Sequence, residues 1–408
     1  MISNQNRPTA RIPAGHWLLI TGPEIEINRW EGVRMGGMKV GVIAAEMEGR
    51  RTGVGRYLEG MLRGLECWDH GCEWHLFFQG DPFTPPAAES GPAIPHFSGH
   101  RGSRGLWEQV VVTRELARHD LDVLFGPAYA LPFSCPLPSV VAMHDLSFEI
   151  LPLEFRPRER WRRRVLARRA ARMADRVLTD TATMADLVSE RYTVPLDRLA
   201  VVPLGVDVEQ FSPAAAVDED RALSELGVQG PYLLWLGAVF ERRLPREVLD
   251  AFAALRRDRP ELGLVMVGGN RLRRPSLLQH WIEELGLGDS VVLHDWVGED
   301  CLAPLYRGAE LSFYLSLHEG FGIPPLESLT CGTPVVVSSG LALDEIWPAY
   351  PYRCLGTTAR AIAATAREIL QDGERSVQVV REASDIIAEL DWESSSRRLV
   401  AELQKVLR

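Results

Sequence analysis

Short apolar segments alternate with helical segments along most of the chain, and this alternation restricts the fold more than any other feature. In the first half, Met38–Ala44 and Ser139–Asp145 are apolar runs of strand length. In the second half, Tyr232–Gly237, Leu262–Asn270 and Val291–Val297 have the same character, and helical segments separate them. Strands that alternate with helices form parallel sheets covered by helices. We therefore predict an α/β protein with two Rossmann-like, doubly wound domains.

The chain length agrees with two domains, because 408 residues exceed what one hydrophobic core usually organises. Residues 1–37 are polar, contain proline and lack a hydrophobic period, so we expect a disordered tail or an over-extended gene start. We expect the N-terminal domain over 38–210, a linker over 211–230 and the C-terminal domain over 231–390. The remaining residues, 391–408, have the pattern of an amphipathic helix.

The overall charge gives no support for nucleic-acid binding, since 45 Lys and Arg face 55 Asp and Glu for a net charge of −10. No apolar run approaches the ~18 residues of a membrane-spanning helix, and the N-terminus lacks the basic-then-apolar pattern of a signal peptide. Six cysteines are scattered through the predicted elements, as expected of reduced thiols. We therefore expect a cytoplasmic protein.

The stretch Ser316–Val336 reads as a turn, a short helix, a second turn and the start of a buried strand. Pro324 and Pro325 suit the first turn of the helix, where an amide hydrogen has no partner. The glycines just before them leave backbone N–H groups accessible at a helix N-terminus, which favours an anion. Glu319 and Glu327 flank this anion site and can accept hydrogen bonds from hydroxyl groups attached to the anion. A sugar nucleotide has such hydroxyls on both sides of its diphosphate.

These two glutamates stand in the frame E-G-F-G-I-P-P-L-E, followed by C-G-T-P-V-V, which resembles the Glu-x7-Glu signature of retaining glycosyltransferases of family 4. The resemblance extends from Met38 to the C-terminus and is closest to bacterial mannosyltransferase-like members. It implies the GT-B fold, in which two Rossmann-like domains face a central cleft and a C-terminal helix crosses back to the first domain. It also implies a nucleotide diphosphate sugar as donor.

The resemblance assigns donor-binding roles within this frame. Glu327 would hold the ribose diol, and Glu319 would contact the transferred sugar. The sugar hydroxyls and the phosphate would meet the backbone of four consecutive residues, Gly320, Phe321, Gly322 and Ile323.

A glycine-containing turn follows the first strand. Gly53 and Gly55 precede a helical pattern, as in the phosphate-binding start of a Rossmann-like half, although a plain turn is the alternative. The turn resembles the family's N-terminal glycine loop, which borders the diphosphate and the acceptor. Related sequences usually have an aspartate near the end of the preceding strand, where this chain has Ala44, Ala45 and Glu46.

His144 and Asp145 close an apolar strand at its carboxyl end, where ligands of open α/β sheets bind. A lone histidine is usually structural, but this position favours a functional role. The two residues resemble the family's His-Asp pair, whose histidine contacts the transferred sugar and stabilises charge that develops in the transition state.

Arg242 and Arg243 follow the strand that ends at Gly237. A departing diphosphate gains negative charge, and preorganised cations lower that barrier. Arginine can also grip phosphate with a planar fork. By resemblance the two residues take the place of the family's Arg-Lys pair, with Gly237 bordering the donor. Arg243 stands where lysine is usual, and the asparagine that normally follows is absent; two exposed arginines capping a loop are the alternative.

Together these residues predict one site between the two halves of the chain. By resemblance, a retaining transferase moves a hexose, with mannose favoured, from GDP-mannose or a UDP-sugar to a glycan or lipid-linked glycan in polysaccharide or lipopolysaccharide synthesis. The family transfers by front-face attack, with the departing phosphate as base. No Asp-x-Asp motif is placed to bind a diphosphate, so we expect neither a metal nor a cofactor.

The segment Arg156–Arg176 contains an arginine-dense helix with an apolar stripe that includes Trp161 and Val165. A solvated helix face is one interpretation. The other is a patch that docks on anionic lipid or on a lipid-diphosphate acceptor, which would place the protein at the inner face of the cell membrane. Many members of the family work there.

Four metal-capable residues occur close together, Cys67, His70, Cys72 and His75, but their spacing is not that of a usual zinc finger or ribbon. We expect a helix end, a turn and a strand in which His75 alternates with its neighbours. Residues 81–105 are rich in Pro, Gly and Ser and are expected to form a surface loop.

Three other functions remain open. A glycoside hydrolase would also use two carboxylates, ~5–10 Å apart, but would leave the arginine pair without a role. A catalytically impaired protein that binds nucleotide sugar is favoured by Arg243 and Leu244. A NAD-dependent enzyme is disfavoured because Gly53 and Gly55 lack a third glycine at the expected spacing.

Overall fold

The structure, a computed structural model, describes residues 37–49, 53–83, 93–214 and 219–407. All of these belong to one unit, Gly37–Arg408. The predicted tail and residues 50–52 of the glycine-containing turn lie outside the described residues, as does part of the predicted linker.

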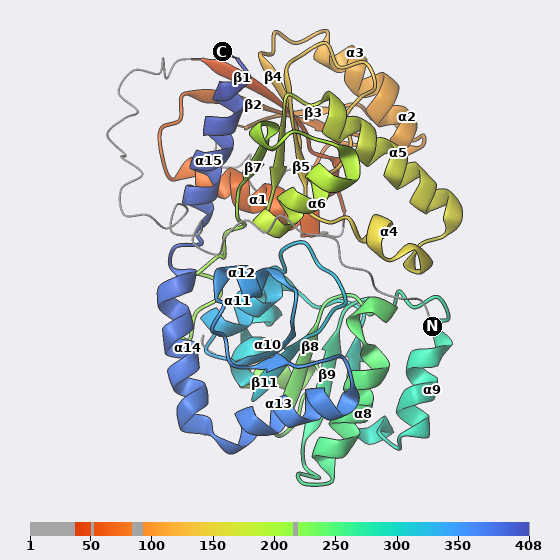
Figure 1. Cartoon of the computed structure of the whole chain (residues 1–408), viewed down its shortest axis with the longest axis vertical. Coiled ribbons are helices and arrows are strands. Elements are labelled where there is room, and N and C mark those ends of the chain that lie inside the picture. Colours follow the sequence, from red (N-terminus) through yellow and green to blue (C-terminus); the bar gives the residue numbers. More distant parts are fainter. Residues whose placement is uncertain (1–36, 50–52, 84–92, 215–218, 408) are drawn as a thin grey trace, which may run out of the picture. The chain divides into compact units, whose positions relative to one another are not determined.

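The first sheet contains seven parallel strands in the order β3-β2-β1-β4-β5-β6-β7. Figure 1 shows this sheet, with all of these strands except β6 labelled. Its strands are β1 (Met38–Ile43), β2 (Cys72–Phe78), β3 (Ala93–Phe97), β4 (Val123–Gly126), β5 (Ser139–Met143), β6 (Arg176–Thr179) and β7 (Leu199–Val201). Its helices are α1 (Gly53–Glu66), α2 (Arg104–Leu106), α3 (Val112–Leu116), α4 (Ser147–Ile150), α5 (Pro157–Met173) and α6 (Ala182–Tyr192).

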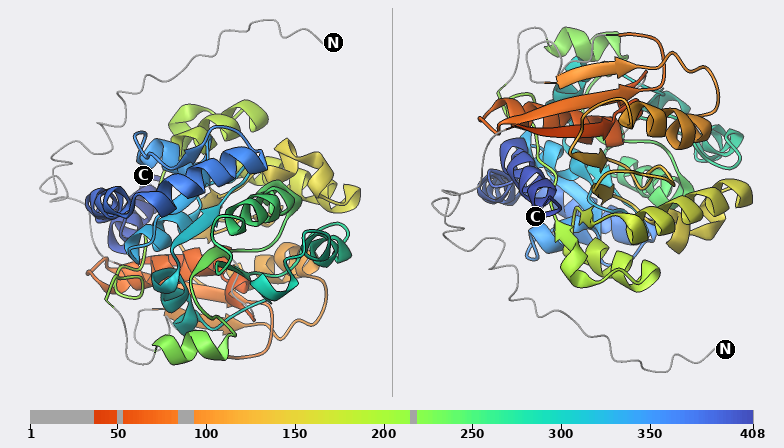
Figure 2. Two further views of the ribbon diagram at one scale, coloured as in Figure 1. Left: turned by 90° about the horizontal axis from the view of Figure 1, so that it is seen from below. Right: turned by 90° about the horizontal axis from the view of Figure 1, so that it is seen from above.

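Alternate residues of each strand of this sheet enter two different cores, because successive side chains point to opposite faces. Val40 and Trp74 pack with α1 and with a helix from the end of the chain, α15 (Trp392–Lys405). Phe77 and Val141 pack with α3, α5 and α6 on the other face. Figure 2 shows this sheet from a second direction.

The second sheet contains six parallel strands in the order β10-β9-β8-β11-β12-β13. Its strands are β8 (Tyr232–Leu236), β9 (Gly263–Val267), β10 (Val291–His294), β11 (Leu311–Tyr314), β12 (Val335–Ser338) and β13 (Arg353–Cys354). Its helices are α7 (Glu219–Glu225), α8 (Pro245–Arg256), α9 (Ser276–Glu284), α10 (Leu302–Gly308), α11 (Ile323–Thr330), α12 (Ala342–Ile346), α13 (Ala359–Gln371) and α14 (Gly373–Ile387). Helices α8, α9 and α13 pack against one face, and α7 and α10 against the other.

The predicted fold class is confirmed, because both sheets are parallel and doubly wound. In each sheet the strand order reverses beside the first strand of that half, between β1 and β4 and between β8 and β11. Ligands of such sheets bind at the carboxyl ends of the strands that flank this switch point. The residues that follow β1, β4, β8 and β11 therefore lie where a ligand is expected, and those that follow β5 come from the strand next to β4.

Two local features differ from the sequence-based expectation. The segment 81–105 includes an edge strand, β3, although it contains Pro95; proline is tolerated at a sheet edge because no neighbour needs its missing N–H. The helix that follows contains a π-helical turn at Trp107–Val111, between α2 and α3. Such turns redirect side chains and are frequent near functional sites.

The last helix, α15, lies against α1 at very short range. A Cβ atom on Gly64 would stand 2.1 Å from the Trp392 backbone oxygen, and one on Gly60 would stand 2.2 Å from the Trp392 ring. A Cβ on Gly205 would meet the Trp392 nitrogen at 2.5 Å. Three glycines therefore make the space into which the start of α15 fits. Among the described residues, no helix combines the length and apolar character required to cross a bilayer.

Candidate active site

The helix α11 begins after Gly322, whose φ of +87° suits glycine and disfavours other residues. A Cβ at this position would stand 2.9 Å from the Tyr314 ring. Pro324 and Pro325 lie in the first turn of the helix, where the missing N–H groups cost nothing. Phe321 is buried beneath the turn, so the segment before the helix is held at both sides.

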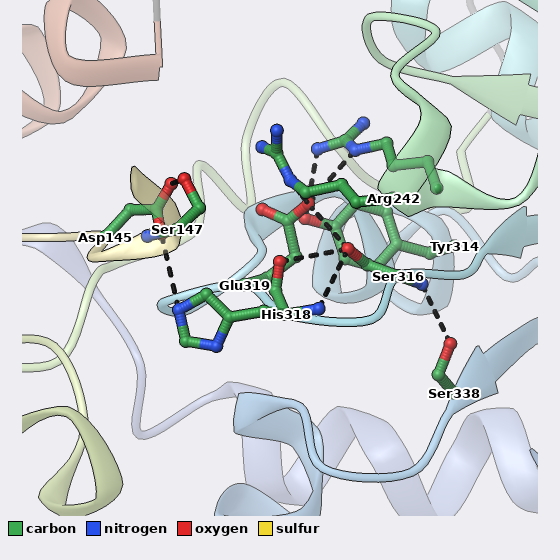
Figure 3. Close-up of polar contacts among 9 residues, drawn as sticks. Asp145, Ser147, Arg242, Tyr314, Ser316, His318, Glu319 and Ser338 are labelled. Atoms are coloured by element: carbon green, nitrogen blue, oxygen red, sulfur yellow. Dashed lines mark hydrogen bonds and ion pairs between the residues drawn. The ribbon is translucent and has the colours of Figure 1, made fainter. Parts of the chain in front are cut away.

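Glu319, just before this turn, faces both predicted arginines, and Figure 3 shows it beside Arg242. Its Oε1 accepts a hydrogen bond from Arg243 Nε at 3.1 Å and lies 3.5 Å from Arg242 Nε. Ser316 Oγ donates to the same oxygen at 3.1 Å. The three charged side chains are each at most 12% exposed. One buried carboxylate therefore holds two guanidinium groups beside the N-terminus of α11.

Aromatic rings support the two guanidinium groups from the other side. Arg242 lies over the Phe240 ring at 4.4 Å, and Arg243 lies over the Tyr314 ring at 5.0 Å. Gly237 is required for this arrangement, since a Cβ there would stand 2.0 Å from Arg243 Nη1. The position of Gly237 at the end of β8 thus leaves room for the second arginine.

Glu327, on α11, is fully buried and already has two partners. Tyr306 donates its hydroxyl to Glu327 Oε2 at 3.0 Å. Arg56, in the first turn of α1, pairs with Glu327 Oε1. The Glu327 carboxylate raises the pKa of Arg56, so this arginine stays charged.

A small pocket adjoins the Arg56–Glu327 pair. Its cavity volume is about 40 Å³, and its walls include Arg56, Phe211, Ile323 and Glu327. Pockets that enclose small-molecule ligands measure roughly 300–1,000 Å³. The pocket in this structure is therefore too small to hold such a ligand.

His144 follows β5 and uses both ring nitrogens inside the first half of the chain. Nδ1 lies 2.9 Å from Asp180 Oδ1, and Nε2 lies 2.8 Å from the Pro127 carbonyl oxygen. Burial disfavours the charged ring, but the Asp180 carboxylate and the Pro127 carbonyl outweigh it and raise the pKa of His144. Both nitrogens can donate only in the protonated ring, and the Tyr57 ring packs against it at 4.3 Å.

The residues that follow β5 and β11 contact each other directly. Gly320 packs against the backbone of His144. Asp145 Oδ1 lies 3.4 Å from His318 Nε2 and accepts a hydrogen bond from the Ser147 backbone N–H at 2.6 Å (Figure 3). Burial opposes the Asp145 charge, but His318, Ser147 and Arg242 lower the pKa of Asp145 below its ordinary value.

A second, larger pocket lies within the first half of the chain and has a cavity volume of about 460 Å³. Its walls carry Glu46, Arg104, Glu108, Tyr129, Arg162 and Arg163, among other residues. Arg104 forms ion pairs with Glu46 at 3.0 Å and with Glu108, on the π-helical turn, at 2.9 Å. Glu46 lies on the 3₁₀ turn Ala45–Met47, after β1, so this pocket has an acidic side chain near the end of the first strand.

The structure brings most of the sequence-predicted residues to the ends of strands or to α11. Gly53 and Gly55 lie in the first turn of α1 and not in a turn before it. Sequence reasoning missed three residues, Arg56, Asp180 and Tyr306. Asp180 directly follows β6, so the carboxyl-end rule would have found it had that strand been recognised.

Comparisons with known proteins cover nearly all of the described chain. A family described as Glycosyltransferase Family 4 matches residues 51–210, and one described as Glycosyl transferases group 1 matches residues 217–385. A D-inositol 3-phosphate glycosyltransferase from Thermobispora bispora is 34% identical over 236 residues, which are 56% of this chain and 55% of that protein. The chain thus spans about half the length of this curated relative.

Solved structures share the fold at low sequence identity. Sucrose-phosphate synthase from Thermosynechococcus elongatus superposes with a TM-score of 0.71 at 17% identity, over 91% of this chain and 98% of that one. HepE from Anabaena, in complex with UDP-glucose, superposes with a TM-score of 0.69 at 17% identity, over 90% and 99% of the two chains. The predicted GT-B fold is confirmed. Because the two family matches together take in both sheets, this chain belongs to the group 1 and family 4 glycosyltransferases.

Proposed function

We propose that the protein is a retaining glycosyltransferase that moves a hexose from a nucleotide diphosphate sugar to a hydroxyl group of an acceptor. One observation carries the proposal: Glu319 holds Arg242 and Arg243 together at the N-terminus of α11. Two guanidinium groups beside the N-terminus of a helix form a binding site for a diphosphate. They stabilise the charge that the diphosphate gains as it leaves, without a divalent metal.

Donor binding requires the pocket beside Glu327 to open. The ribose diol would replace Arg56 and Tyr306 as partners of the Glu327 carboxylate. Because Arg56 carries a permanent charge, the released side chain can contact the diphosphate. In this structure the same arginine neutralises a fully buried carboxylate, which otherwise would be costly to bury.

The transferred sugar would lie between Glu319 and His144. A sugar hydroxyl would replace the Pro127 carbonyl as partner of His144 Nε2, while Asp180 keeps the ring oriented through Nδ1. The backbone of Gly320, next to the His144 carbonyl, would line the same space. Front-face attack, with the departing phosphate as base, then needs no protein carboxylate as nucleophile.

The acceptor would occupy the 460 Å³ pocket, and we propose that it carries an anionic group. Arg104 pairs with the two carboxylates of that pocket and Arg163 pairs with Glu159, and Arg162 adds a further positive charge to its wall. The name of the Thermobispora bispora relative specifies D-inositol 3-phosphate, a phosphorylated polyol. A phosphorylated polyol is therefore the first acceptor to test, and mannose transfer to a glycan or lipid-linked glycan is the second candidate.

One observation supports a lipid-linked acceptor. Helix α5 exposes Trp161 (68%) and Val165 (38%) on one face, between Arg158 and Arg168 at helical spacing. Apolar and basic side chains on one exposed face suit peripheral contact with an anionic membrane. A solvated face remains the alternative for the rest of the helix, because Arg163 and Arg164 pair with Glu159 and Glu149.

The test is a panel of GDP-mannose, UDP-glucose, UDP-GlcNAc and UDP-galactose with EDTA present. We expect one donor to raise the melting temperature and to release nucleotide when D-inositol 3-phosphate or a lipid-linked glycan is added. Glu327→Ala should abolish both effects, whereas Glu368→Ala, at an exposed position of α13, should not.

The same panel separates the rival functions. A donor that stabilises the protein without turnover, with every acceptor, would indicate a catalytically impaired nucleotide-sugar-binding protein. Release of sugar from a nucleotide-free glycoside would indicate a hydrolase. No stabilisation by any donor would contradict the proposed use of this site.

A further inference from the structure

Three histidine side chains meet on the first sheet, far apart in sequence. His75 belongs to β2, His96 to the edge strand β3, and His119 to the segment between α3 and β4. Each offers one ring nitrogen, and the three nitrogens lie within 4.8 Å of one another. Within the described ranges this is the one group of three or more metal-capable side chains so close together.

The rings are already arranged with their nitrogens facing one another. His75 Nδ1 lies 2.9 Å from His96 Nε2, and these two rings stack with centroids 5.1 Å apart. The His119 ring centroid is 4.2 Å from that of His96. The His75 side chain is 10% exposed, and the other two histidines are half-buried. The three rings therefore form a site that is partly enclosed by the protein and partly open to solvent.

A carboxylate fixes the orientation of the innermost ring. His75 Nε2 lies 2.6 Å from Glu73 Oε1, on the same face of β2. A histidine that gives its N–H to a carboxylate exposes the lone pair of its other nitrogen, which is the usual arrangement around metal-bound imidazole. His75 Nδ1 therefore presents a lone pair to the space shared with His96 and His119.

We propose that His75, His96 and His119 bind a divalent transition-metal ion of the zinc type, with Glu73 as the positioning residue. Zinc takes three imidazole nitrogens at ~2.0–2.1 Å together with a fourth ligand such as water. The ion would replace the hydrogen bond between His75 and His96, and His96 would carry its proton on Nδ1.

The sequence cluster Cys67, His70, Cys72 and His75 does not form this site. Cys72 enters the core beside α1, whereas His75 points to the opposite face of β2. Burial raises the pKa of the Cys72 thiol to about 11, so it remains protonated. The other two proposed ligands, His96 and His119, come from β3, which was not expected from sequence, and from the segment before β4.

The site is separate from the transferase site. His119 precedes β4 at the amino end of that strand, whereas His144 and the donor residues follow the carboxyl ends of their strands. The ion would connect β2, the edge strand β3 and the α3–β4 segment. The ion would have a structural role, so sugar transfer in the presence of EDTA would not contradict this site.

The experiment uses the full chain after chelator treatment and dialysis, titrated with Co²⁺ and then with Zn²⁺. We expect one Co²⁺ per chain with the visible absorption of a tetrahedral site, displaced by Zn²⁺, and a higher melting temperature with Zn²⁺. His96→Ala and His119→Ala should each weaken binding by about 100-fold or more, and Glu73→Gln by about 10–100-fold. Circular dichroism without metal would establish that each variant is folded.

Two matched controls make the result specific. His280→Ala removes an exposed histidine of α9, and Cys67→Ser removes the exposed thiol of the sequence cluster. Neither should change Co²⁺ affinity. The proposal would be overturned if His96→Ala and His119→Ala bound Co²⁺ as tightly as the wild type does. Loss of binding in Cys67→Ser, or no saturable binding to the wild type, would overturn it as well.

Discussion

Gly320 lies directly against the backbone of His144: a Cβ atom at position 320 would stand 1.5 Å from the His144 carbonyl oxygen. The turn before α11 and the end of β5 thus touch through backbone atoms alone. No side chain fits between them, so this glycine sets how closely two parts of the proposed site approach.

Gly320→Ala is therefore expected to lower transfer by at least about 100-fold, because small displacements at a reacting centre have effects of that size. Position 320 lies outside the helices and strands, so the variant should remain folded by circular dichroism. Gly288→Ala is the control, since a Cβ there meets nothing within 4 Å. Equal initial rates for the two variants would show that the contact is not needed for transfer.

The pair between the half-buried Arg56 and the fully buried Glu327 should contribute more to stability than an exposed pair. Arg56→Met leaves an uncompensated buried carboxylate, which costs about 3–5 kcal/mol of unfolding free energy. In a double-mutant cycle with Glu327→Gln, measured by urea unfolding, we expect a coupling free energy of about 1–3 kcal/mol between the two side chains. The exposed pair Arg221–Glu225 should couple by less than about 1 kcal/mol. Additive effects at Arg56 and Glu327 would contradict the pairing.

The His144–Asp180 pair predicts a pH-dependent term in stability. Because folding raises the pKa of His144 above 6.5, its contribution is complete below about pH 6.5 and is lost as the pH rises through the folded-state value. The stability difference between wild type and Asp180→Asn should therefore shrink from about pH 6 to alkaline pH. His144→Gln should remove this dependence. A difference that stays constant with pH would exclude the charged pair.

Thr193 ends α6 in the left-handed region, with φ of 59°, and its side chain is exposed. A β-branched residue is strained there, whereas asparagine is tolerated at helix ends. Thr193→Asn should raise the unfolding free energy by about 0.5–1 kcal/mol. Chemical denaturation measures this directly, and Thr183→Asn, inside the same helix, should not stabilise. A lower stability for Thr193→Asn would argue against strain at this position.

Vesicle co-sedimentation tests the exposed face of α5. Binding to anionic vesicles should weaken roughly fivefold for each of Arg158→Gln and Arg168→Gln, since a basic residue at such a surface contributes ~1 kcal/mol. Trp161→Ser should weaken it as well, and Trp296→Ser, exposed elsewhere, should not. No binding by the wild type would favour a solvated helix face.

The sequence was sufficient to predict both sheets, because apolar runs of strand length alternate with helices. It also predicted that His144, Arg242 and Arg243 follow the ends of strands, as the structure shows, while their roles in the reaction stay predictions. It missed β3 because Pro95 and the surrounding Pro, Gly and Ser residues read as a loop. The partner of Glu327 could not be predicted, since Arg56 is 271 positions away and only the assembled fold brings them together.

The close packing of Trp392 against Gly60, Gly64 and Gly205 has a consequence for folding during translation. Helix α15, which covers α1, follows the second sheet in the chain, so the apolar side chains of that face of α1 stay uncovered while the second sheet is translated. The first half of the chain therefore completes its core only after α15 has been synthesised.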